Sequence, residues 1–126
     1  MTNDIDKNKL INAWILLRHA EENSPEYNDN FWAFNSLSDI SIKEPELCWE
    51  LIEKIRKKDG SDVVLSNLAA GPLEDLLVKH GNQFIDLIEK DAKKDMQFRK
   101  LLGAVWKNDI DDDVWTRIKR VAGPSW

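Results

Sequence analysis

The residues with the greatest potential for chemistry are two adjacent carboxylates, a histidine and two arginines in the second half of the chain. Glu74 and Asp75 follow a Gly-Pro turn at the expected start of a helix, where backbone amides could bind an anion or a substrate. His80 could act as a general base, with Arg99 or Arg117 as an anion clamp. Such a set would suit a small hydrolase or lyase.

The same residues also have a structural interpretation. The helix dipole favours acidic side chains in a first turn, and Asp75 and Lys79 have the spacing of an i,i+4 ion pair. Glu74 and His80 lie about 120° apart on an α-helix, so acting together would require a bridging group. In this interpretation His80 caps a helix end, and the two arginines pair with the two carboxylates from neighbouring helices.

The elements that would position these residues are all predicted to be helices. Gly71 is expected to end one helix, Pro72 to begin the next and Gly81 to end it. The other helical patterns cover residues 4–20 with Asp4 as N-cap, 28–37, 45–58, 61–70, 82–94, 95–106 and 111–121. The expected fold is all-α, a compact stack of about eight short helices in antiparallel hairpins within a single domain of residues 1–126. A HEAT-like stack is one form of this, although no motif recurs at a fixed period.

The chain resembles a bacterial family of uncharacterised small proteins. The segments that carry the resemblance are Leu68-Ala-Ala-Gly-Pro-Leu-Glu-Asp-Leu-Leu, His80-Gly81, Phe98-Arg99-Lys100-Leu101-Leu102, Val105-Trp106 and Asp113-Val114-Trp115-Thr116-Arg117. The resemblance is specific over residues 68–121. It implies an all-helical domain of unknown function, and it assigns no catalytic residue.

Composition narrows the classes of function. A net charge of −5 argues against a nucleic-acid-binding surface, and residues 1–60 hold 12 acidic and 8 basic side chains, against 11 and 10 in residues 61–126. No apolar run is long enough to span a bilayer and no secretory signal is evident, so we expect a cytoplasmic protein. Cys48 is expected to be a buried, inert thiol, and no metal ligand set or cofactor motif is found.

An acidic helical chain without catalytic motifs favours a protein-binding function. Six tryptophans exceed what the core requires: Trp14, Trp49, Trp106 and Trp115 are expected in the core, whereas Tyr27, Trp32 and Trp126 are candidate interface anchors. The leading hypothesis is an immunity or inhibitor protein that occludes a basic toxin or effector domain. Its binding residues would be those aromatics together with Glu21, Glu22, Glu26 and Asp29. A helical adaptor protein is the third alternative.

Overall fold

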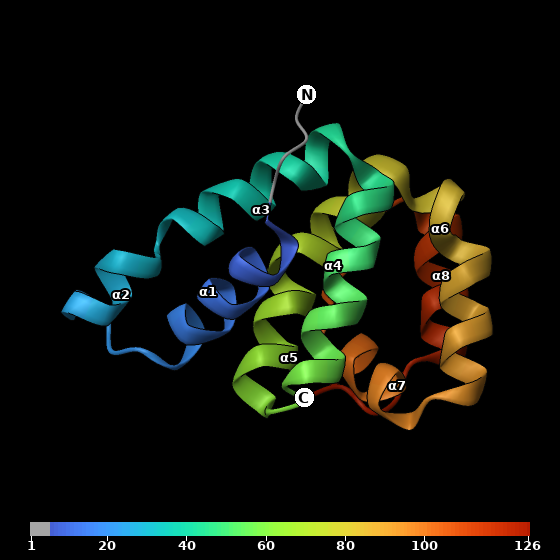
Figure 1. The fold of residues 1–126 in the computed structure, drawn as a ribbon. Coiled ribbons are helices and arrows are strands. Elements are labelled where there is room, and N and C mark those ends of the chain that lie inside the picture. Colours follow the sequence, from blue (N-terminus) through green and yellow to red (C-terminus); the bar gives the residue numbers. More distant parts are fainter. Residues whose placement is uncertain (1–5) are drawn as a thin grey trace.

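Residues 6–126 fold into helices in the computed structural model, which describes this part of the chain (Figure 1). The predicted cap Asp4 lies outside the described residues. The elements are α1 (Lys7–His19), α2 (Pro25–Asn30), α3 (Trp32–Lys43), α4 (Pro45–Lys58), α5 (Asp62–Leu68), the π-helical turn η1 (Ala69–Leu73), α6 (Glu74–Lys94), α7 (Met96–Gly103) and α8 (Asp112–Val121). No strand occurs within residues 6–126, and the predicted all-α class is confirmed.

The number of separate helices is lower than expected because two expected breaks are absent. Neither of the gaps expected at residues 71–72 and after residue 81 occurs, because α5, η1 and α6 follow one another directly from residue 62 to residue 94. α2 and α3 are separated only by Phe31 and together correspond to the one helix expected at residues 28–37. Counted as continuous rods, the described helices number six instead of about eight.

The Gly-Pro turn is part of the longest rod, so the predicted helix end at Gly71 and start at Pro72 are wrong. A proline ring clashes with the carbonyl four residues earlier in an α-helix, and the wider turn of η1 accommodates it. The predicted end at Gly81 coincides with a kink: His80 has non-helical backbone angles (φ −136°, ψ 25°), and a second helical segment of α6 follows it without an intervening loop. A Cβ on Gly81 would lie 3.1 Å from both methyl groups of Val114, so this glycine permits close contact between α6 and α8.

Side-chain caps determine where several helices begin. The carboxylates of Asp6 and Asp95 and the hydroxyl of Ser24 accept the backbone N–H of the residue three positions later, at 3.0, 3.2 and 3.1 Å. Asp95 confirms the predicted cap of α7. The helix predicted from residue 28 instead begins at Pro25, because Ser24 supplies a cap and a proline at the first position needs no donor.

The rod formed by α5, η1 and α6 connects the two ends of the molecule. α1 packs against α2, α3, α4 and α5, whereas α6 packs against α3, α4, α7 and α8. In Figure 1, α2 therefore lies at one end and α8 near the other, with α4 and α5 between them. α2 contributes no buried side chain and packs mainly against α1 and α3. None of the helices within residues 6–126 has the length and apolarity needed to cross a membrane.

Cys48 belongs to the hydrophobic core and is fully buried, as predicted. Burial, together with the nearby carboxylate of Asp75, raises the pKa of its thiol to about 12. The thiol is therefore neutral at physiological pH.

Candidate functional site

The five residues considered for catalysis do not converge on one site. Glu74 accepts a hydrogen bond from the side-chain amide of Asn108 at 2.9 Å. Asp75, His80 and Arg99 line three different pockets. The geometry therefore does not assemble the proposed hydrolase or lyase set.

Arg117 braces α8 against the second half of α6. Its Nε donates to Glu89 Oε2 at 2.9 Å, and its Nη2 donates to Asp86 Oδ1 and Glu89 Oε1, both at 2.6 Å. These hydrogen bonds raise the pKa of the guanidinium. The predicted pairing of Arg117 with Glu74 or Asp75 is wrong, because α8 packs on the part of α6 that follows the bend.

His80 lies at the kink of α6, where one helical segment ends, but no hydrogen bond from its side chain to a helix carbonyl is found among the described residues. Its Nε2 is buried without a hydrogen-bond partner among the described residues. The polar pocket that His80 borders, about 490 Å³, also includes Asp109 and Asp111 from the segment before α8. No group of three or more potential metal ligands occurs within residues 6–126.

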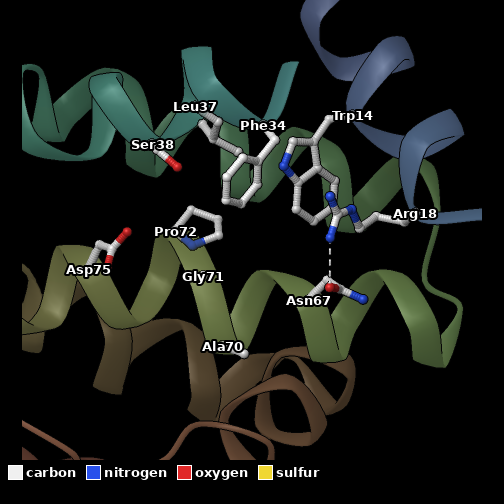
Figure 2. Close-up of a pocket in the computed structure, with 10 residues that line it drawn as sticks. All are labelled: Trp14, Arg18, Phe34, Leu37, Ser38, Asn67, Ala70, Gly71, Pro72 and Asp75. Atoms are coloured by element: carbon white, nitrogen blue, oxygen red, sulfur yellow. Dashed lines mark hydrogen bonds between the residues drawn. The ribbon is translucent and has the colours of Figure 1, made fainter. Parts of the chain in front are cut away.

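A pocket lies between α1, α3 and the π-helical turn (Figure 2). It has a volume of about 300 Å³. π-Helical turns occur frequently at functional sites, so the presence of η1 in the wall makes this pocket a candidate ligand site. The lining residues are Trp14, Arg18, Phe34, Leu37, Ser38, Asn67, Ala70, Gly71, Pro72 and Asp75.

Arg18 supplies the cation of this pocket. Its guanidinium carbon lies 5.1 Å from the ring centroid of Trp14 and 5.9 Å from that of Phe34, and Nη1 donates to Asn67 Oδ1 at 2.8 Å. No carboxylate of residues 6–126 forms an ion pair with Arg18, and its Nε is buried without a partner. Burial lowers the pKa of the guanidinium. The pocket thus contains a fixed, partly desolvated cation that has no counter-ion within residues 6–126.

Asp75 lies at the opposite end of the same pocket from Arg18, as Figure 2 shows. The predicted ion pair with Lys79 is not formed, and no other cation of the described residues pairs with Asp75. Gly71 lies between the two charges on the π-helical turn, and a Cβ added there would meet no atom within 4 Å. The pocket is therefore charged at both ends and open at Gly71.

A second candidate surface is the acidic arm, which we define as residues 20–32. It contains four carboxylates and no lysine or arginine, and its carboxylates form no ion pair with described residues. All four are exposed: Glu21, Glu22, Glu26 and Asp29. The arm, which includes α2, therefore carries four negative charges and no positive one, against a net charge of −5 for the chain.

The predicted aromatic anchors differ in exposure and location. Trp32 is 39% exposed at the end of the arm, beneath the ammonium group of Lys9, whereas Tyr27 is half-buried, with its ring 5.6 Å from that of Phe31. Trp126 lies on α7 instead, where its indole N–H donates to the carbonyl of Lys100 at 2.6 Å. Only two of the three predicted anchors, Tyr27 and Trp32, therefore belong to the acidic arm.

Two further residues were not identified from the sequence. Trp106, predicted to be in the core, is 68% exposed, because α7 ends at Gly103 and the helical period no longer applies. Arg56, only 2% exposed, donates to Glu53 and Asp95 at 2.8–3.0 Å. In the sequence Arg56 is one of several basic residues at the end of α4, and only its burial in the structure distinguishes it from Lys57 and Lys58.

Comparison with known proteins gives one result. No curated protein and no solved structure matches the chain significantly. A family model described as a family of unknown function (DUF6869) matches residues 20–125, which include the acidic arm and the π-helical turn but not α1. The chain therefore belongs to this family of unknown function.

Proposed function

We propose that the protein is a non-catalytic binding module whose acidic arm docks on a basic protein partner. The observation that carries this proposal is the concentration of unpaired charge in residues 20–32, next to the exposed ring of Trp32. Charge of one sign on one surface steers association with an oppositely charged partner. An exposed tryptophan within such a surface supplies an apolar anchor.

The most concrete form of this function is that of an immunity or inhibitor protein which occludes a toxin or effector domain. The dispersal of Glu74, Asp75, His80, Arg99 and Arg117 supports binding over catalysis. α2 also supports it, because this helix contributes no side chain to the core and its surface is available for a partner. A helical adaptor would use the same surface with a different partner.

The test is affinity capture from the native host with a charge-matched control. The arm variant combines Glu21→Gln, Glu22→Gln and Asp29→Asn, and leaves Glu26 in place because it lies in the first turn of α2. The control combines Glu44→Gln, Asp91→Asn and Asp109→Asn, which changes the net charge by the same amount outside the arm.

We expect one basic protein to be retained by the wild type and the control and lost from the arm variant. Its retention should fall as ionic strength rises, because exposed charges are screened. Trp32→Ala should weaken capture at every ionic strength. Retention of the same proteins by the arm variant and the control, or capture of no basic protein by the wild type, would contradict the proposal.

A further inference from the structure

We propose that the pocket between α1, α3 and the π-helical turn binds a small free zwitterion, with a carboxylate at the Arg18 end and an ammonium group at the Asp75 end. The inference concerns a different surface from the acidic arm. It rests on the two charges that line the pocket, the apolar walls between them and the room at Gly71.

The Arg18 end is suited to a carboxylate. Guanidinium groups bind carboxylates through two parallel hydrogen bonds. In Arg18 only Nη1 donates a hydrogen bond to a described residue, Asn67. The flanking rings of Trp14 and Phe34 hold the guanidinium in place by cation–π contacts. A bound carboxylate would supply the counter-ion that residues 6–126 do not provide.

The Asp75 end is suited to an ammonium group. Its carboxylate has no cationic partner among the described residues, and Ser38 offers a hydroxyl acceptor in the same part of the pocket (Figure 2). Leu37 and Pro72 line the space between the two ends with carbon atoms. A purely anionic ligand would leave the Asp75 carboxylate unused, and a purely cationic ligand would leave Arg18 unused.

The placement of the two charges indicates the kind of ligand. Arg18 and Asp75 lie at opposite ends of the pocket, with apolar side chains between them. An ω-amino acid, whose carboxylate and ammonium group are separated by several methylene groups, suits this arrangement better than an α-amino acid, whose two charges are adjacent. A volume of about 300 Å³ suits a small molecule of this kind.

The probes are 6-aminohexanoate, hexanoate and hexylamine, titrated into the full chain by calorimetry and by NMR of the Trp14 indole N–H. We expect saturable binding of 6-aminohexanoate with a Kd below about 1 mM, and binding of the other two at least about tenfold weaker. A shorter ω-amino acid of three carbons should also bind at least about tenfold less tightly, because it cannot reach both charges. Equal affinity for hexanoate and 6-aminohexanoate, or no saturation by any probe, would overturn the proposal.

Variants separate the two ends of the pocket. Asp75→Asn should lower the affinity for 6-aminohexanoate to that for hexanoate, which should itself be unchanged. Arg18→Gln should abolish binding of both, and Gly71→Leu should do so by filling the pocket while leaving both charges in place. Binding that is unaffected by Arg18→Gln or by Gly71→Leu would overturn the proposal.

Two controls exclude indirect effects. Arg120→Gln combined with Asp91→Asn removes the same two types of charge from elsewhere on the surface and should leave binding unchanged. The arm variant should bind 6-aminohexanoate like the wild type, so failure of the acidic-arm proposal and failure of this one are distinguishable. Thermal unfolding of each variant establishes that it is folded.

Discussion

Arg56 is buried and Arg18 is half-buried, and the surroundings of the two guanidinium groups are opposite. Arg56 is bound by Glu53 and Asp95 and stacks 4.8 Å from the ring centroid of Phe98. Arg18 stacks on aromatic rings in the same way, yet a neutral amide is its only hydrogen-bond partner among the described residues. The comparison indicates that Arg56 is part of the framework and that Arg18 is available to a ligand.

The pKa values of the two groups follow the same contrast. Burial lowers the pKa of both guanidinium groups. For Arg56 the hydrogen bonds that it donates to Glu53 and Asp95 outweigh burial and raise the pKa, whereas no carboxylate does so for Arg18. Burying a charge is costly unless it is paired, so without a bound anion the cost at Arg18 is offset only by stacking and by the hydrogen bond to Asn67.

The largest expected effect is that of Arg56→Met. The substitution leaves Glu53 and Asp95 without their cation at the junction of α4 with α7. Removing one partner of a buried pair costs about 3–5 kcal/mol, and we expect about 3 kcal/mol because Asp95 is partly exposed. Urea unfolding measures the change. A loss below about 1 kcal/mol would show that the cluster is not a framework element.

The pH dependence of stability should depend on the same cluster. Burial opposes ionisation of Asp95, but the hydrogen bonds from Arg56 and from the backbone of Phe98 outweigh it and hold the pKa below its ordinary value of 3.8. A lowered carboxylate pKa contributes stability above the ordinary value, and this contribution is lost as pH falls through the lowered value. Unfolding measured from pH 6 to pH 2 should therefore show a smaller difference between wild type and Arg56→Met at the acidic end. A difference that is constant with pH would contradict the role of Asp95.

Gly81 and Gly71, on the same rod, offer a second comparison between the tightly packed framework and the open pocket. Gly81→Ala should destabilise the protein by about 1 kcal/mol, because the new methyl group lies 3.1 Å from Val114. Gly71→Ala should be neutral or stabilising by up to about 1 kcal/mol, because its methyl group meets no atom within 4 Å. Thermal unfolding of both variants measures the difference, and equal effects would indicate that the space at Gly71 is already filled.

The smallest expected effect is that of Arg18→Met. Loss of the Asn67 hydrogen bond and of the cation–π contacts is offset by removal of a partly desolvated charge. We therefore expect a free energy of unfolding within about 1 kcal/mol of the wild type. The same substitution at the two arginines thus separates a framework residue from a ligand-binding one. A loss as large as that of Arg56→Met would place Arg18 in the framework instead.

The sequence by itself determined the all-α class, the burial of Cys48 and several helix ends. These features are local, since a 3.6-residue apolar period, a capping residue such as Asp95 or a proline at a first turn acts within a few residues of itself. The same local rules failed at Gly71 and Pro72, which have the types expected at a helix boundary, although η1 joins α5 to α6 without a gap there. At Gly81 they located the interruption to within one residue, because the backbone of His80 is non-helical, but they did not show that a second helical segment follows directly.

Only the tertiary structure decided which polar groups meet. The sequence singled out Asp75 and Arg117 but predicted that Arg117 would pair with Glu74 or Asp75. It did not distinguish Arg18 or Arg56 from the other cations. Arg18 and Asn67 are separated by 49 positions, and Arg56 and Asp95 by 39, so their contacts depend on how whole helices pack. The burial of a charge and the presence of a counter-ion are properties of that packing, which is why the pocket and the Arg56 cluster could not be predicted from residue types and spacing.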